Sequence, residues 1–192
     1  MDTATVDNSS GGIVVGGSYT GISVEGTGLT SGEDEILLTT SKGQSIRFSE
    51  KAVRSMGRAA GGVTGIKLTK PGDFVVSGVI IPKVNKDIYL ITVSEGGYGK
   101  RTPTKEHKVQ NRGGSGVLTY KVTEKTGTLI SAKPLAKSVE SDMLIATQSG
   151  KVLRLSAQQI PALGRATQGV RLIRLDKEDR VTSATLISKE YD

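Results

Sequence analysis

Residues 99–122 read GKRTPTKEHKVQNRGGSGVLTYKV, and this stretch decides the fold because the chain contains it in three versions. It aligns without a gap with SIRFSEKAVRSMGRAAGGVTGIKL at 45–68 and with VLRLSAQQIPALGRATQGVRLIRL at 152–175. The copies are spaced by 54 and then 53 residues. Internal repeats of this period are typical of propeller-like arrays, in which each repeat is one small sheet.

Each copy lies between apolar segments that predict strands. The segments before the copies are EILLTTSKGQ, DIYLITVSEGGY and DMLIATQSGK, and those after them are FVVSGVIIPK, TLISAKPLAK and VTSATLISKE. One unit is therefore about four short strands, the size of a propeller blade. We predict an all-β, propeller-like fold of three whole four-stranded units and part of a fourth. The predicted units are an acidic N-terminal segment with the tail of a partial blade at 1–34, then blades at 35–86, 87–141 and 142–192.

The composition supports this fold class. The chain has 25 glycines among 192 residues and only 4% aromatic residues, which suits short strands joined by turns. No Pro/Ser-rich linker separates the units, so we expect one continuous domain over residues 21–190. The absence of cysteine excludes disulfides and thiolate metal sites. The chain also lacks a long apolar run and a signal-like N-terminus, and we expect a cytoplasmic protein.

Positive charge is concentrated in the body of the chain. All 26 Lys and Arg residues follow position 41, whereas six of the 19 acidic residues fall within the first 35. Residues 36–192 therefore carry about +13. A basic body with a pI near 9.6 attracts polyanions, chiefly nucleic acid. Solubilising surface charge is the alternative interpretation.

Basic residues recur at equivalent positions of the three copies. In Ile46-Arg47-Phe48 the alternation of side chains along a strand places the arginine opposite the apolar pair. The three equivalent sets are Arg47, Arg101 and Arg154; Lys67, Lys121 and Arg174; and Arg58, Arg112 and Arg165. A surface that follows DNA phosphates needs similar charge on each blade. Protection of strands against edge-to-edge aggregation is the simpler interpretation.

Glycines also recur, at positions 62, 116 and 169. A glycine there permits a positive φ and lets backbone N–H groups approach a phosphate closely. Equally, the turn itself can require the glycine, and for any single glycine this is the simpler explanation.

The sequence offers little for catalysis. His107 is the only histidine and we expect it to be solvated, so we expect neither a multi-histidine metal site nor a Ser-His-Asp triad. GGYGK at 96–100 lacks the spacing and the hydroxyl residue of a phosphate-binding Walker loop. Carboxylates before the first strand of each unit could in principle converge as in a hydrolase, but we interpret them as acidic turn residues. We expect no enzymatic activity, no cofactor, no metal and no small-molecule substrate.

Three motifs carry a resemblance to a known family. TSGEDE at 30–35, GYGKRT at 97–102 and GRATQGV at 164–170 resemble the C-terminal blades of the DNA gyrase A C-terminal domain, with the corresponding domain of topoisomerase IV similar but less close. The resemblance implies a β-pinwheel, a propeller-like disc whose neighbouring blades exchange strands and which binds and bends duplex DNA without sequence preference. It also implies a bacterial, nucleoid-associated setting, with the remainder of gyrase A, and gyrase B, as partners.

The predicted DNA-binding set comprises the nine repeated cations together with Lys100 and Lys151. Gln110, Asn111, Arg112, Gly113, Gly114, Ser115 and Gly116 form a turn that resembles the family's box Q-R-R-G-G-K-G at five of seven positions. This turn lies in a middle unit and lacks two basic residues of the box. A complete domain of the family has five or six blades, so the resemblance covers only part of one.

A function of another class stays open at this point. A propeller-type scaffold for protein interactions would use the positive charge only for solubility. Its DNA binding would be weak and would depend no more on the Arg58 set than on basic residues such as Lys51, Lys86 and Lys189.

Overall fold

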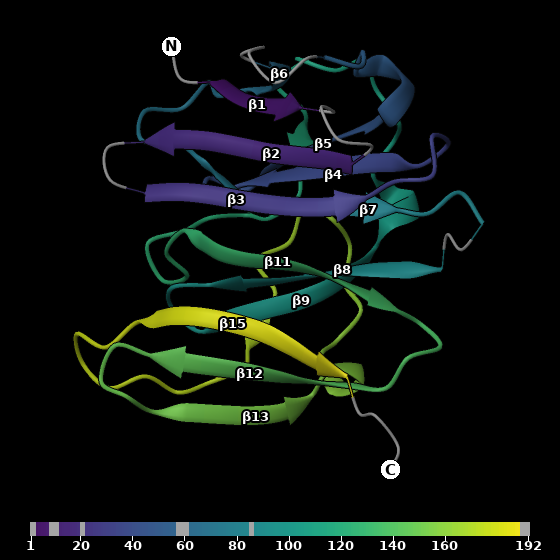
Figure 1. The fold of residues 1–192 in the computed structure, drawn as a ribbon. Coiled ribbons are helices and arrows are strands. Elements are labelled where there is room, and N and C mark those ends of the chain that lie inside the picture. The colour runs from purple at the N-terminus through teal and green to yellow at the C-terminus, as the bar shows by residue number, and fades with distance from the viewer. Residues whose placement is uncertain (1–2, 8–11, 20–21, 57–61, 85–86, 189–192) are drawn as a thin grey trace. The chain divides into compact units, whose positions relative to one another are not determined.

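The computed structural model describes residues 3–7, 12–19, 22–56, 62–84 and 87–188. The chain divides into two compact units. The first contains residues 1–86 and 107–118, and the second contains residues 87–106 and 119–192. Antiparallel sheets make up both units (Figure 1).

The first unit holds two four-stranded sheets. One has the order β3-β2-β1-β6, with β1 (Thr3–Asp7), β2 (Gly12–Tyr19), β3 (Ile22–Leu29) and β6 (Val63–Lys67). The other has the order β10-β5-β4-β7, with β4 (Glu35–Thr40), β5 (Gln44–Ser49), β7 (Val75–Ile81) and β10 (Val117–Leu118). The N-terminal residues, predicted as the tail of a further unit, thus supply three strands of one sheet.

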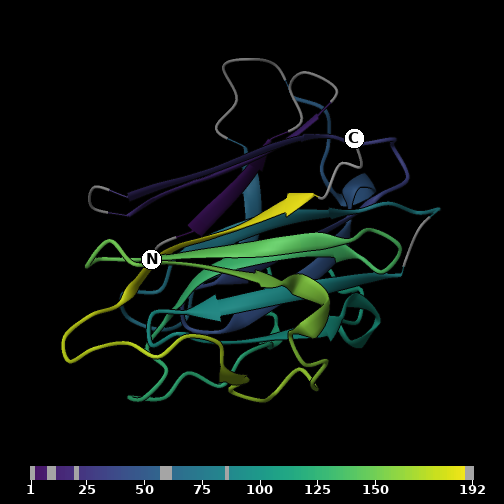
Figure 2. The ribbon, with the colours of Figure 1, turned by 90° about the horizontal axis from the view of Figure 1, so that it is seen from below.

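The second unit repeats this plan. Its first sheet has the order β11-β8-β9-β14, with β8 (Ile88–Ser94), β9 (Tyr98–Pro103), β11 (Leu129–Ala136) and β14 (Val170–Arg171). Its second sheet has three strands among the described residues, in the order β13-β12-β15, with β12 (Ser141–Thr147), β13 (Val152–Ser156) and β15 (Val181–Ser188). Figure 2 views this last sheet from below.

The fourth strand of each complete sheet comes from the following repeat. After β5, β9 and β13 the chain forms a short 3-10 helix, which is η1 (Glu50–Ala52), η2 (Thr104–Glu106) or η3 (Ala157–Gln159). It then crosses to the preceding sheet, where β6 pairs with β1, β10 with β5 and β14 with β9. The crossing after β5 includes residues outside the described ranges, so only the two later crossings are named. Residues 107–118 are the first crossing segment and residues 160–171 are the second. The strand exchange that the resemblance implied is confirmed.

Alternation along the strands builds a core in each unit. The β7 side chains alternate between buried and half-buried positions, as the period of two requires. Ile36, Leu38, Ile46 and Phe48 form the centre of the core in the first unit. Ile91, Val93, Met143 and Ile145 do so in the second. The cores fix the sheets, and apart from Arg47 and Lys100 the cationic side chains of the described residues are half-buried or exposed.

Candidate functional site

The arginine set on the second strand of each repeat is paired within its own sheet. Arg47 on β5 forms an ion pair with Glu35 on β4, with 2.8 Å from Nε to the carboxylate, and Arg154 on β13 pairs with Asp142 on β12 at 2.6 Å. In the middle repeat the acid is replaced by Tyr89, and the Arg101 guanidinium lies 4.9 Å from the centre of that ring. All three are diagonal cross-strand pairs, whose side chains lie within reach on one face.

The three arginines of this set differ in their accessibility to solvent. Arg47 is buried, and its Nη1 also donates to the carbonyl of His107 at 3.2 Å. Arg101 is half-buried, whereas the Arg154 side chain is 65% exposed despite its partner. His107 itself is buried, so the expectation that it would be solvated is wrong. Of this set, Arg154 is the member that a ligand can reach most easily.

The predicted box, residues 110–116, fastens the first crossing segment to β5, β6 and η1. Gln110 N–H donates to the carbonyl of Arg47 at 2.7 Å, and Gly113 N–H donates to that of Gly65 at 2.9 Å. The Arg112 side chain donates from Nε to the carbonyl of Ala52 at 3.1 Å and from Nη1 to that of Thr64. A guanidinium supplies several donors in a fixed fork, which suits it to join two carbonyls. Arg112 therefore already has a role within the fold.

At two of its three repeated positions, Gly116 and Gly169, the glycine is required by the close approach of the crossing segment. Gly62, Gly116 and Gly169 have φ values of +73°, +70° and +76°. A Cβ at Gly116 would lie 2.3 Å from the carbonyl oxygen of Ser45, and one at Gly169 would lie 2.5 Å from that of Gly99. Only glycine fits this combination of positive φ and backbone contact. The turn therefore accounts for these glycines.

Lys100 fastens the second crossing segment in a different way. Its side chain is fully buried, and Nζ donates to the carbonyls of Gly164 at 2.7 Å and Arg165 at 2.5 Å and to the hydroxyl of Thr167 at 3.2 Å. Burial lowers the pKa of Lys100 to about 8, because an apolar environment disfavours the charged form. An amino group enclosed in this manner does not reach a phosphate, and we leave Lys100 out of the candidate surface.

The set Lys67, Lys121 and Arg174 is the most accessible of the three. All three side chains are exposed, and no hydrogen bond or ion pair is found for them within the described ranges. Their main chains are held firmly in two cases: Lys67 N–H donates to the carbonyl of Gly114 at 2.9 Å, and Lys121 N–H to that of Thr167 at 3.1 Å. Each of these lysines thus projects from a point where a crossing segment meets its sheet.

The remaining predicted residues differ in their surroundings. Arg165 is half-buried, and its N–H donates to Glu106 at 3.0 Å. Lys151 is exposed and forms an ion pair with Asp176, whose hydrogen bond raises the pKa of the lysine. Asn111 and Ser115 are exposed within the box. Arg58 lies outside the described residues.

Two further cations escaped the sequence analysis. Arg171 and Lys125 both lie over the ring of Tyr98, at 5.6 and 5.4 Å from its centre. Arg171 Nη2 donates to the Tyr98 hydroxyl at 3.0 Å, and hydrogen bonds from Arg171 and then Lys125 lower the pKa of that hydroxyl. Neither cation has a basic equivalent in the first repeat, where the positions hold Thr64 and Pro71, so the comparison of repeats carried no signal for them.

Other kinds of site find no support in the described part of the chain. It contains no group of three or more His, Cys, Asp or Glu side chains arranged to hold a metal ion. Within the same residues no helix is long and apolar enough to cross a membrane. What the geometry does provide is exposed positive charge at repeated positions.

Comparison with known proteins agrees with the architecture. Three segments match the model of a family described as the DNA gyrase C-terminal domain, a β-propeller: residues 34–82, 89–136 and 141–188. DNA gyrase A of Lawsonia intracellularis is 46% identical over 143 residues, which are 74% of this chain and 17% of the relative. DNA gyrase A of Staphylococcus aureus is 40% identical over 164 residues, which are 85% of this chain and 18% of the relative. The chain thus spans less than a fifth of these relatives.

Two solved structures resemble the whole chain. A structure of the DNA gyrase A C-terminal domain matches with a TM-score of 0.73 and 26% identity, covering 96% of this chain and 65% of that one. The C-terminal domain of DNA topoisomerase IV matches with a TM-score of 0.79 and 20% identity, covering 97% of this chain and 62% of that one. The second likeness concerns the fold alone. The predicted resemblance and the all-β pinwheel class are confirmed.

Proposed function

The chain belongs to the family of DNA gyrase C-terminal domains, and from that membership we propose that it binds duplex DNA through its repeated exposed cations. The observation that carries the proposal is the recurrence of Lys67, Lys121 and Arg174 at one structural position, each exposed. Solvent-facing cations of this kind exchange their counterions for DNA phosphates, which drives binding and makes it salt-dependent. Arg154 adds an accessible charge at a second repeated position.

Duplex DNA fits this surface better than a single strand does. Single-strand binders stack bases on aromatic side chains, whereas aromatic residues are 4% of this chain and Tyr89 and Tyr98 already stack with cations of the protein. The binding is sequence-tolerant, because phosphate contacts carry no base information. Any preference among sequences arises from how easily the DNA bends.

We propose that the chain works within a larger assembly. The chain is a non-catalytic module that wraps or bends DNA for gyrase, and its partners in the bacterial cytoplasm are the remainder of gyrase A together with gyrase B. The high identity to gyrase A proteins supports gyrase as the parent enzyme. We expect DNA cleavage to take place in another domain of that enzyme.

The test compares two triple variants, each of which removes three positive charges. Lys67→Ala/Lys121→Ala/Arg174→Ala removes the repeated cations, and Lys133→Ala/Lys137→Ala/Lys177→Ala removes three exposed lysines outside the three repeated sets. Fluorescence anisotropy of a labelled duplex at several salt concentrations gives affinity and salt slope. We expect the first variant to lower the log–log slope by about 2–3, since each phosphate contact contributes about 0.9. Equal losses in both variants, or no binding by the wild type at low salt, would overturn the proposal.

A separate experiment measures whether the protein wraps DNA. Relaxed circular plasmid is incubated with the protein and a relaxing topoisomerase, and the deproteinised DNA is analysed on a gel. A change in linking number that the first triple variant abolishes supports wrapping. Salt-sensitive binding without such a change would restrict the function to holding DNA.

A further inference from the structure

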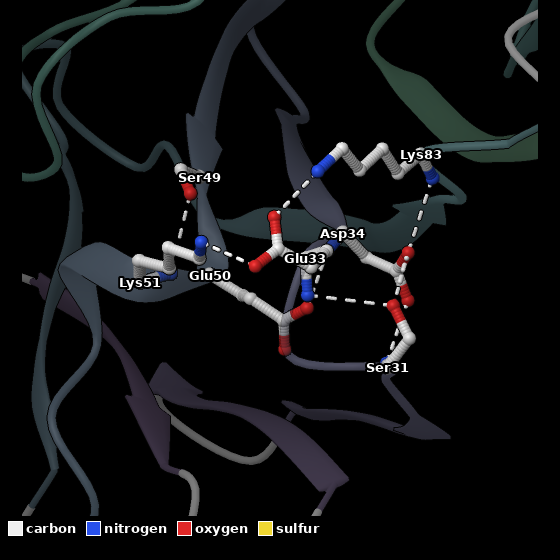
Figure 3. A network of polar contacts seen from close by, with 7 residues as sticks. All are labelled: Ser31, Glu33, Asp34, Ser49, Glu50, Lys51 and Lys83. Carbon is white, nitrogen blue, oxygen red and sulfur yellow. Dashed lines mark hydrogen bonds and ion pairs between the residues drawn. The ribbon is translucent and has the colours of Figure 1, made fainter.

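The turn before β4 is held rigidly by a buried carboxylate. Asp34 is buried and accepts hydrogen bonds from the N–H and the hydroxyl of Ser31, both at 2.8 Å, and from the N–H of Lys83 at 3.1 Å (Figure 3). Its main chain exchanges hydrogen bonds with Glu50, whose N–H donates to the carbonyl of Asp34 at 3.0 Å. Burial on its own would raise the pKa of Asp34, but the hydrogen bonds from Ser31 and Lys83 outweigh it and lower the pKa. This turn is fixed without any help from the Glu33 side chain.

Glu33 projects from this turn between two lysines. One carboxylate oxygen contacts Nζ of Lys51 and the other accepts from Nζ of Lys83 at 2.7 Å (Figure 3). The side chains of Glu33, Lys51 and Lys83 are 46%, 61% and 58% exposed, respectively. Hydrogen bonds from Lys51 and then Lys83 lower the pKa of Glu33 to about 2, so it is ionised at any physiological pH. One acid therefore neutralises part of the charge of two exposed cations.

Stability does not explain this arrangement. Exposed ion pairs contribute a median of only about 0–1 kcal/mol, because water and salt screen them. The two ion pairs instead change the electrostatic field around η1. Lys51 immediately precedes Ala52, whose carbonyl accepts from the side chain of Arg112, and Arg54 is exposed close by in the sequence. Glu33 thus reduces the positive charge of the surface that surrounds η1.

We propose that Glu33 competes with DNA phosphates for Lys51 and Lys83 and so limits the affinity of this sheet for duplex DNA. Phosphate oxygens can replace the carboxylate oxygens at both amino groups, but the backbone of Glu33 stays in place because Asp34 fixes the turn. A bound phosphate therefore lies within reach of the Glu33 carboxylate, whose negative charge opposes it. The inference rests on the proposed function, and it makes Lys51 and Lys83 part of the DNA-binding surface.

The first test replaces the acid while keeping its shape. Glu33→Gln is compared with Glu124→Gln, which removes the same charge from an exposed turn where the structure gives the carboxylate no ion pair among the described residues. Anisotropy with a labelled duplex at about 0.1 M salt should show Glu33→Gln binding roughly 3–10-fold more tightly, with a log–log salt slope steeper by about 1–2. Glu124→Gln should stay within a factor of about two of the wild type. Equal affinity of Glu33→Gln and the wild type, or an equal gain in Glu124→Gln, would overturn the inference.

A second test asks whether Glu33 masks these particular lysines. Lys51→Gln/Lys83→Gln is made in the wild type and in the Glu33→Gln background, and thermal unfolding confirms that each variant is folded. The double lysine change should cost several-fold more affinity in the Glu33→Gln background, where both amino groups are open to phosphate. Equal costs in both backgrounds would contradict competition. If neither the wild type nor Glu33→Gln binds DNA, the proposed function itself fails; if the wild type binds and Glu33→Gln matches it, only this inference fails.

Discussion

Both crossing segments are held by a cation that donates hydrogen bonds to backbone carbonyls, but the cation comes from the segment in one case and from the receiving strand in the other. In the first, Arg112 belongs to the segment and reaches back to the carbonyls of Ala52 and Thr64. In the second, Lys100 belongs to the receiving strand β9 and reaches forward to the carbonyls of Gly164 and Arg165. Each arrangement provides hydrogen-bond donors to backbone carbonyls of the crossing segment or of the elements that it contacts. Equivalent positions in a repeat therefore need not carry equivalent roles, since the cation can come from either partner.

The largest loss of stability should follow substitution of the glycine that both crossing segments contain. Gly116→Ala and Gly169→Ala place a Cβ within 2.3 and 2.5 Å of a carbonyl oxygen at positive φ, and each should cost about 2–4 kcal/mol in free energy of unfolding. Gly150→Ala is the matched control, because its φ is +84° but nothing lies within 4 Å of the added methyl. Urea unfolding measures all three. A loss at Gly150 as large as at Gly116 would show that the backbone angle, and not the crossing, accounts for the cost.

Lys100→Met should have the next largest effect. It leaves the carbonyls of Gly164 and Arg165 without their donor, at a cost of about 1–3 kcal/mol. The wild type should also respond to pH. The pKa of Lys100 is about 8 in the folded protein and 10.5 as its ordinary value, so between these pH values the unfolded chain binds more protons and stability rises with pH. Unfolding followed across this pH range should show the wild type gaining stability relative to Lys100→Met; a constant difference would refute the assigned pKa.

Arg112→Ala should destabilise less than Lys100→Met. The arginine is only half-buried, and water can reach the carbonyls that it leaves, so about 1–2 kcal/mol is expected. Arg112→Lys should recover part of this loss, because a single amino group cannot follow the fork of a guanidinium across both carbonyls. The measurement is again urea unfolding. Full recovery by lysine would mean that the charge alone, without the paired geometry, stabilises the first crossing segment.

The smallest effect is expected at Thr167. Its hydroxyl accepts from Lys100 at 3.2 Å and donates to the carbonyl of Gly164 at 2.9 Å, and the side chain is exposed. Thr167→Val keeps the shape and should cost about 0.5–1 kcal/mol. In a double-mutant cycle with Lys100→Met the two losses should be less than additive, because they share one hydrogen bond. Strict additivity would place Thr167 outside the contact that Lys100 makes.

The sequence was informative where the repeats agree. Alternating residues predicted the strands, and the equivalence of Gly62, Gly116 and Gly169 predicted a shared turn, which the structure confirms with three positive φ values. The strand exchange came only from the family resemblance. Strands of two residues, such as β10 and β14, are too short to leave a periodic pattern. The N-terminal strands likewise follow a connectivity that the three aligned repeats do not contain.

Side-chain roles were predicted less well, because the recurrence of a charge does not show which side chains surround it. Lys100 aligns with Ile46 and Leu153, which are inward-facing positions, so its burial could have been anticipated from the alignment. Tyr89 aligns with Glu35 and Asp142, and this substitution signals that the middle arginine has an aromatic partner. The Glu33 cluster could not have been found in this way, since it joins the turn before β4, the 3-10 helix η1 and the bend after β7, which are far apart in sequence.

Strand exchange also sets an order of events during synthesis. The sheet that contains β5 receives β10 through a pairing of Ser45 with Val117, so its edge stays bare until the next repeat has largely been translated. The sheet that contains β9 waits in the same way for Val170 to pair with Gly99. A growing chain consequently always exposes one incomplete edge, which moves forward by one repeat at a time. A ribosome stalled between repeats would present that edge to other nascent chains, and the short length of the missing strand limits how firmly a wrong partner can hold it.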